Sequence, residues 1–405
     1  PPRENPPVDS GGSVDLSKIR TRMPAQPQVS RDLIGESITS RPDGALFPRP
    51  PLEPALPMSR LTLAHHRQLE EDGYTVVKSV FSQDLCGRLR ALMDEILGPS
   101  AEKVENSPQD GEHAADYATI ERLLAEKKPL VTSSRWIHSI RHPICNHEGG
   151  IDGGALMAEA TTSGGMLEIH QELLRCKPED LRLMQHFARR TDPSPPHVLP
   201  PKGAYGATDE SPNPGWHVDG GFVPSQYEST PKQIFYHSMT ALCDVQPGGG
   251  AIMILPECFR RVKAALRGME PDKANEAWSV EHGAYSIGRV VEQQLRPELD
   301  LGSGIEVLLE AGDLFIVDPS MLHAATPNTR GDLTPEYRRY VLFSTFFDKH
   351  TTDHLLPPRG SSGPAIKFAP DMRAALPQKL HSLFDWTAPS PEEAEAVMRQ
   401  RIARM

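Results

Sequence analysis

Two residue types that bind iron stand two positions apart in the middle of the sequence. His217 and Asp219 lie in the run Gly215-Trp216-His217-Val218-Asp219-Gly220-Gly221. If this run is an extended strand, both side chains point to the same face. Two imidazoles and one carboxylate on one side of an ion are the ligand set of non-haem Fe(II) oxygenases, which keep other coordination positions open for reactants. The pair therefore predicts two of the three ligands of such a site.

A histidine that can complete this ligand set comes much later in the chain. His323 follows a glycine-led turn and an apolar run at residues 312–317, and it precedes Pro327-Asn328. These neighbours predict that His323 stands at the end of a strand. We therefore predict that His217, Asp219 and His323 bind one metal ion and form the catalytic centre.

The sequence contains another histidine with an acidic residue two positions later, in His170-Gln171-Glu172. Residues 167–174 have the pattern of a helix, and in a helix side chains two positions apart point in different directions. We therefore interpret His170 as a solvated helix residue. His237 lies in a predicted strand, and we interpret it as a satisfied core or surface histidine.

Two arginines stand at the start of an apolar run. Arg338 and Arg339 precede Tyr340-Val341-Leu342-Phe343. A guanidinium buried in a β-barrel needs a planar anion, and a carboxylate matches its forked geometry. Because side chains alternate along a strand, only one of the two arginines can face inward. The residues alone leave both candidates open.

The elements around these residues divide the chain into parts. Residues 1–59 are rich in proline and predict an extended or disordered N-terminal arm, which leaves residues 60–405 as the catalytic domain. In its first part, the sequence predicts a helix at residues 63–71 that ends at Gly73. A second helix is predicted after Ser82, which can cap its N-terminus.

The second part of the domain changes from helical to β character. Residues 167–190 have a helical pattern that is interrupted near Lys177-Pro178, whereas from about residue 197 short β-type runs alternate with proline and glycine. Such runs predict a closed or sandwiched β core. A helical insertion is expected at about 258–300, and a helical extension at about 370–405.

The composition restricts the class of protein. The chain has 405 residues and a formal net charge of −11, which disfavours a nucleic-acid partner because phosphate contacts need a basic face. No apolar stretch approaches the roughly 20 residues that span a bilayer. The five cysteines are scattered, without a C-x-x-C pair, which indicates a reducing compartment and a cytoplasmic location. The oligomeric state is not indicated.

Taken in order, these motifs resemble those of the phytanoyl-CoA dioxygenase family of Fe(II)/2-oxoglutarate-dependent oxygenases. The resemblance covers roughly residues 62–350. The matching segments are Leu69 to Lys78, Trp216 to Gly220, Gly250 to Pro256, Gly312 to Asn328, and Arg338 to Val341.

The resemblance implies a fold, a ligand set and a reaction. The fold would be mainly β, with a double-stranded β-helix (jelly-roll or cupin-like) core and flanking helices. His217 and Asp219 would be the first two iron ligands and His323 the distal one. Arg338 would anchor the far carboxylate of 2-oxoglutarate, because the family pattern Arg-x-apolar-apolar favours it over Arg339. O2 would be the co-reactant, with ascorbate as a candidate stimulant.

The implied activity is the hydroxylation, or another oxidation, of a C–H bond in a small molecule, with release of succinate and CO2. Pro256-Glu257-Cys258 replaces the usual Gly-Ser-His, and the spacing between Asp219 and His323 is long, which suggests a substrate unlike the family's acyl thioesters. Ala325 replaces a frequent hydroxyl residue that can contact the cosubstrate. Two alternatives remain: an oxygenase acting on a protein or nucleic acid, and a non-catalytic metal-binding β-barrel protein.

Overall fold

The structure is a computed structural model, and it describes residues 60–98, 103–105, 122, 126, 131–134, 137–140, 153–193, 235–261, 263, 304–326, 328–330, 335–349 and 374–384. All of these residues belong to one compact unit, Leu52–Met405. The predicted arm at 1–59, nearly all of the insertion at 258–300 and most of the extension at 370–405 lie outside the described residues. These boundaries stay predictions.

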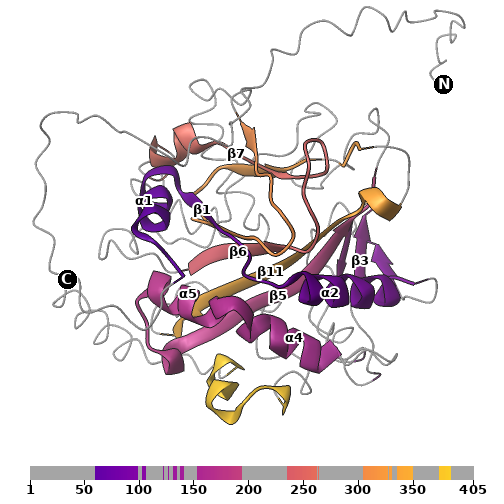
Figure 1. Cartoon of the computed structure of the whole chain (residues 1–405), viewed down its shortest axis with the longest axis horizontal. Coiled ribbons are helices and arrows are strands. Elements are labelled where there is room, and N and C mark those ends of the chain that lie inside the picture. The colour runs from indigo at the N-terminus through magenta and orange to yellow at the C-terminus, as the bar shows by residue number, and fades with distance from the viewer. Residues whose placement is uncertain are drawn as a thin grey trace, which may run out of the picture. The chain divides into compact units, whose positions relative to one another are not determined.

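The described strands form two sheets (Figure 1). The larger sheet has eight strands in the order β1-β9-β6-β11-β5-β4-β3-β2, and the smaller has three in the order β10-β7-β8. Their bounds are β1 Tyr74–Val77, β2 Lys103–Glu105, β3 Val131–Ser134, β4 Ile137–Ile140, β5 Leu181–Thr191, β6 Phe235–Ala241, β7 Ile252–Ile254, β8 Ile305–Glu306, β9 Leu314–Val317, β10 His323–Ala325 and β11 Arg339–Asp348. Only β2 and β3 pair in parallel among these strands. The predicted fold class, a mainly β protein with a double-stranded β-helix core and flanking helices, is confirmed.

The α-helices alternate with the first strands of the chain, and α2, α4 and α5 pack on one face of the larger sheet. They are α1 Leu63–Asp72, α2 Gln83–Ile96, α4 Gly153–Thr162 and α5 Met166–Leu174, with short 3-10 segments η4 Ser163–Gly165, η5 Pro178–Asp180, η7 Pro256–Cys258, η10 Pro335–Tyr337 and η13 Gln378–Phe384. The sequence predicted how two of them begin or end. Gly73 ends α1 in the left-handed conformation, and the Ser82 hydroxyl accepts a hydrogen bond from the Leu85 N–H at the start of α2. None of the described helices has the length and apolar character needed to cross a membrane.

One predicted helix is wrong in its second half. The helical pattern expected over residues 167–190 holds only as far as Leu174, where α5 ends, and β5 then runs from Leu181 to Thr191. Arg175 adopts a left-handed conformation and Pro178 follows, which stops the helix. Both faces of β5 are covered, so polar and apolar residues do not alternate along it as they do in a half-buried strand. Its conformation is decided by its pairing with β11 and β4.

Two apolar clusters lie on opposite faces of the larger sheet. One packs the sheet against α2, α4 and α5 and includes Leu342 and Phe346 of β11. The other lies between the two sheets and includes Val341 and Phe343 of the same strand. Even-numbered residues at the start of β11 therefore face the helices, and odd-numbered ones face the interior between the sheets.

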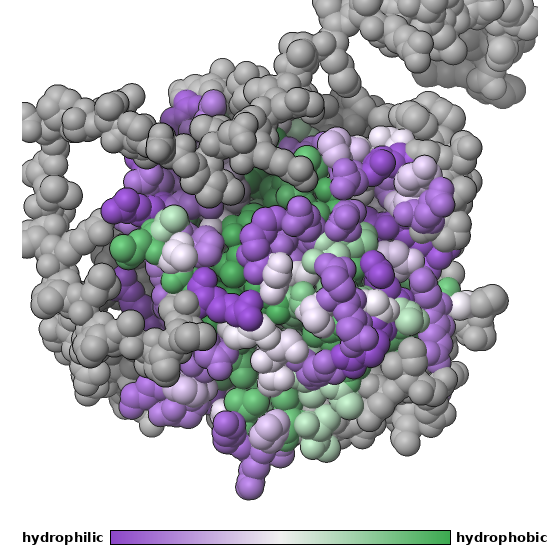
Figure 2. All heavy atoms as spheres, viewed as in Figure 1, coloured by the Kyte–Doolittle hydropathy of each residue, from purple (hydrophilic) through white to green (hydrophobic). Residues whose placement is uncertain are grey.

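The surface of the described fold is mostly polar. Only three large apolar side chains among the described residues are exposed: Leu63, Leu308 and Tyr337. On the face shown in Figure 2, apolar residues are visible in patches between charged and polar ones. The apolar clusters thus account for most of the large apolar side chains that the structure describes.

Candidate active site

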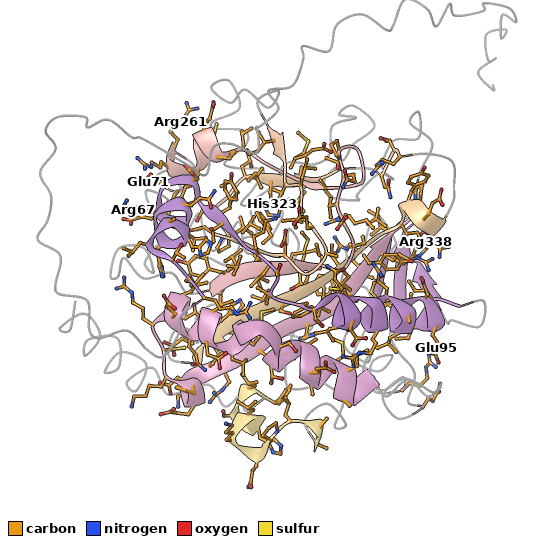
Figure 3. The ribbon with its side chains drawn as sticks, in the orientation of Figure 1. Arg67, Glu71, Glu95, Arg261, His323 and Arg338 are labelled. Atoms are coloured by element: carbon orange, nitrogen blue, oxygen red, sulfur yellow. The ribbon has the colours of Figure 1, made fainter. Side chains whose placement is uncertain are left out.

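His323 is the first residue of β10, in the smaller sheet, where it pairs with Ile254 of β7. In Figure 3 it lies toward the centre of the described fold. Its ring Nδ1 lies 2.9 Å from the carbonyl oxygen of Met321. A carbonyl can only accept, so Nδ1 carries the proton in this bond and Nε2 holds the lone pair. A backbone carbonyl on one ring nitrogen is the usual partner of a histidine that binds a metal through the other.

A buried aspartate stabilises the turn between β9 and β10, which precedes His323. Asp318 follows β9, and its carboxylate accepts the Ser320 N–H at 2.8 Å and pairs with the Lys263 ammonium at 2.6 Å. The Met321 N–H donates to the Asp318 carbonyl at 2.8 Å. Asp318 therefore has a structural role, because it shapes the turn between β9 and β10.

The turn before β9 is fixed in a similar way. Gly312 has a φ of +95°, and a Cβ there would lie 2.3 Å from the Phe81 carbonyl oxygen, so only glycine fits. Next to it, the Asp313 carboxylate accepts the N–H groups of Ser79 and Glu310 at 3.1 and 2.9 Å. Asp313 thus stabilises the turn, and it connects the loop after β1 to the start of β9.

His217 and Asp219 lie outside the described residues. Within the part of the chain that the structure describes, no group of three His, Cys, Asp or Glu side chains could hold a metal ion. The ligand set of His217, Asp219 and His323 therefore stays a prediction. Of these three residues, the structure describes only His323.

Arg339 is the buried member of the arginine pair. It is 5% exposed, and its Nη2 lies 3.1 Å from the Met239 sulfur on the interior face of β6. Within the described part of the chain, its Nε has no hydrogen-bond partner and no carboxylate pairs with it. Burial, and then the neighbouring charge of Arg189, lower the pKa of Arg339 to about 10, so the group is still cationic at neutral pH.

Arg338 points the other way. Its Nε lies 3.4 Å from the Asp192 carboxylate and its Nη1 lies 3.7 Å from the carboxylate of Asp94, a residue of α2. Its side chain is 26% exposed, and in Figure 3 it lies at the rim of the fold near α2. The inward orientation that the resemblance implied for Arg338 therefore belongs to Arg339. The pairing of Arg339 with Thr191 and of Val341 with Ala241 sets this register.

A second buried arginine, Arg189, lies on the interior face and was not predicted from the sequence. Arg189 of β5 donates from Nε to the Ser139 hydroxyl at 3.1 Å, and it is 7% exposed. Its guanidinium carbon lies 5.6 and 5.3 Å from the ring centres of Phe187 and Phe343, which stack on each other at 4.6 Å. The missed signal was the two-residue spacing of Phe187 and Arg189, which places them on one face only if the segment is a strand.

The structure corrects the interpretation of His170. It lies on a helix as expected, but it is fully buried: Nδ1 donates to the Met166 carbonyl at 2.7 Å, and Nε2 lies 3.1 Å from the Ser238 hydroxyl. Burial lowers its pKa to about 4. His237 is half-buried, with Nδ1 at 3.1 Å from the Thr345 hydroxyl. His170 packs on the helix side of the larger sheet and takes no part in the candidate site.

Known proteins resemble this chain at the level of sequence and of fold. A family model described as phytanoyl-CoA dioxygenase matches residues 69–335. A comparison with curated proteins found no match.

Several solved structures are similar over most of their length. SnoK, a non-haem α-ketoglutarate-dependent carbocyclase of nogalamycin biosynthesis, is 15% identical with a TM-score of 0.43, over 73% of this chain and 88% of its own. HygX from Streptomyces hygroscopicus, with nickel and 2-oxoglutarate bound, is 11% identical with a TM-score of 0.39, over 71% and 87%. The epimerase SnoN, in complex with Fe3+, α-ketoglutarate and nogalamycin RO, is 14% identical with a TM-score of 0.40, over 73% and 90%.

Proposed function

Because the chain belongs to the phytanoyl-CoA dioxygenase family and is thus an Fe(II)- and 2-oxoglutarate-dependent oxygenase, we propose that it oxidises a C–H bond of a small molecule. Hydroxylation is the expected outcome. The proposed ligands are His217, Asp219 and His323, and the proposed anchor for the far carboxylate of 2-oxoglutarate is Arg339 in place of Arg338.

When bound, Fe(II), O2 and 2-oxoglutarate supply the oxidising power, and the cosubstrate leaves as succinate and CO2. The protein's own residues orient and shield the reactants. The Met321 carbonyl accepts the hydrogen bond of the His323 Nδ1 and so orients the ring. The apolar cluster between the sheets, which includes Val341, excludes water from the reacting groups.

The observation that carries the choice of Arg339 is a buried guanidinium with an unsatisfied donor. Leaving a buried Nε–H without a partner costs about 1–3 kcal/mol, more for a charged group. Arg339 has this donor on the interior face, whereas Arg338 already pairs with two carboxylates. A carboxylate that enters between the sheets would accept the hydrogen bond that the Arg339 Nε does not make within the described part of the chain.

Two observations support a small-molecule substrate. The net charge of −11 disfavours nucleic acid, and the described surface exposes only three large apolar side chains, so it offers little to a protein partner. An oxygenase acting on a protein or nucleic acid, or a non-catalytic metal-binding barrel, stays the alternative. The cytoplasmic location stays a prediction from the scattered cysteines.

The test is a screen of small-molecule metabolites with Fe(II), ascorbate and 2-oxoglutarate, measuring succinate. The expected result is a substrate that raises succinate formation and gains one oxygen atom. His323→Ala is the control variant, and it should abolish the stimulation. Stimulation only by peptides or oligonucleotides would favour the macromolecular alternative. Absence of any 2-oxoglutarate turnover by iron-loaded protein would favour the non-catalytic one.

A further inference from the structure

A series of hydrogen bonds connects the side chain of Lys263 to the ring of His323. The Lys263 ammonium donates to Oδ2 of Asp318 at 2.6 Å, and Oδ1 of the same carboxylate accepts the Ser320 N–H at 2.8 Å. The Asp318 carbonyl accepts the Met321 N–H, also at 2.8 Å. The Met321 carbonyl in turn lies 2.9 Å from Nδ1 of His323. The ring of the proposed iron ligand is therefore linked to a cation that lies 55 positions before Asp318.

Asp318 is a buried carboxylate with a fixed orientation. It is 2% exposed, and both of its carboxylate oxygens accept hydrogen bonds. Its backbone N–H donates to the carbonyl of Gly73, at the end of α1, at 2.8 Å. Hydrogen bonds to an ionised group are roughly twice as strong as those between neutral groups. These bonds therefore hold the turn between β9 and β10 in one conformation.

Lys263 supplies the counter-charge for this buried carboxylate. It lies in the segment that follows η7, and its side chain is 23% exposed. Its ammonium also lies 5.1 Å from the ring centre of the buried Phe259, which is a cation–π distance. Removing one partner of a buried ion pair is costly, because it leaves the other charge uncompensated. The position of the Asp318 carboxylate thus depends on Lys263.

We propose that Asp318 and Lys263 are positioning residues for His323. The inference rests on the proposed function, in which His323 binds Fe(II). The pair fixes the turn that directs the Met321 carbonyl toward Nδ1 of His323, and this carbonyl sets the tautomer and the direction of the ring. A ring that is oriented before the ion arrives binds it more tightly than one that must be ordered during binding. Asp318 and Lys263 therefore raise the affinity for Fe(II), although the proposed ligands are other residues.

The same strand offers a matched control at its other end. Asp313 precedes β9, is 1% exposed and pairs with the Lys78 ammonium at 2.6 Å, as Asp318 pairs with Lys263 after the strand. Asp313 also accepts two backbone N–H groups of its turn. The hydrogen bonds of Asp313 run to the loop after β1, whereas those of Asp318 run toward His323. The two ion pairs thus have the same chemistry but different connections.

The test measures the Kd of Fe(II) by calorimetry, without O2, on the metal-free full chain. Asp318→Ala removes the acceptor of the Ser320 N–H and should raise this Kd at least about tenfold, as is typical when an outer partner of a metal ligand is lost. Lys263→Met keeps that acceptor and should raise the Kd by about three- to tenfold. Lys263→Arg keeps the cation, so its Kd should lie closer to that of wild type than to that of Lys263→Met.

A spectroscopic measurement separates positioning from a general loss of stability. The visible absorption bands of Co(II), bound in place of Fe(II), depend on the number and geometry of the ligands. Asp318→Ala and Lys263→Met should change these bands. Lys78→Met removes the matched cation, and it should leave both the bands and the Kd unchanged, whatever its effect on thermal unfolding. If Asp318→Ala does not fold, the comparison of Lys263→Met with Lys78→Met carries the test.

Two results would overturn this inference alone. Lys78→Met could raise the Kd as much as Lys263→Met does, which would indicate general destabilisation. Alternatively, His323→Ala could weaken Fe(II) binding while the Asp318 and Lys263 variants bind it as tightly as wild type. If His323→Ala itself binds Fe(II) with wild-type affinity, the proposed ligand set fails, and the inference fails with it.

Discussion

Arg338 and Arg339 are adjacent in sequence, yet they face opposite sides of the larger sheet. Arg338 contacts the carboxylates of Asp94 and Asp192 on the side of α2, and Arg339 is buried between the sheets beside Met239. The partners differ in kind as well as in place. One arginine pairs with two carboxylates of the protein, and the other has an Nε donor without a hydrogen-bond partner among the described residues.

The first prediction concerns this pair. Arg339→Met should raise the KM for 2-oxoglutarate at least about tenfold, because it removes a buried two-pronged partner of the carboxylate. Arg338→Met should change that KM less than about twofold, because its surface ion pairs contribute little. Steady-state succinate formation measures both. The opposite ranking would place the cosubstrate on the α2 side of β11 and would restore Arg338 as the anchor.

The second prediction concerns the metal. Purified protein should bind one Fe(II) per chain, and either His217→Ala or His323→Ala should lower the affinity by about tenfold or more, because each removes one of three protein ligands. Iron content after dialysis and calorimetric titration measure this. His381→Ala is the control, since His381 lies in η13 and contacts the Leu376 carbonyl. Wild-type iron content in both ligand variants would contradict the assignment.

The third prediction concerns acid stability. Burial lowers the pKa of His170 from 6.5 to about 4 in the folded state, so the unfolded chain binds the extra proton first. Its contribution to stability is present above pH 6.5 and is lost as the pH falls toward 4. The loss is on the order of 3 kcal/mol at the lower end.

His170→Gln provides the comparison, because an amide can still donate to the Met166 carbonyl but does not titrate. Urea unfolding between pH 7 and 4 should show a shallower pH dependence for this variant than for wild type. The pKa of the buried His186 is also lowered by burial, so both proteins should keep part of the pH dependence of the free energy of unfolding. Identical slopes would mean that His170 does not titrate on unfolding.

The fourth prediction concerns the type of reaction. Iron halogenases related to this family carry a small residue where Asp219 stands, so that chloride can bind the metal. In the proposed site, the carboxylate of Asp219 would fill that coordination position with charge and volume. We therefore expect oxidation without chlorination. Mass spectrometry of the product formed in chloride buffer under ¹⁸O2 should show one added labelled oxygen. A chlorinated product would refute the expectation, and an oxidised product without label would indicate desaturation or ring closure.

The sequence by itself determined those features that depend on neighbouring residues. Ser82 caps α2, Gly73 ends α1, and the Gly312-Asp313 turn leads into β9, as their local hydrogen bonds require. The histidine at the start of β10 was also predictable, because a turn, an apolar run and a Pro-Asn ending surround it. Ordered motifs over most of the domain then identified the family.

Only the tertiary structure decided which face each residue occupies. Residues 181–191 became a strand because β11 and β4 pair with them on either side, and that pairing brought Arg189 to the interior. The same ladder turned Arg339 inward and Arg338 outward, since a shift of one residue reverses every side chain of a strand. Burial of His170 depended likewise on the sheet beneath α5. Local sequence cannot specify these outcomes, because the partner strands lie far away along the chain.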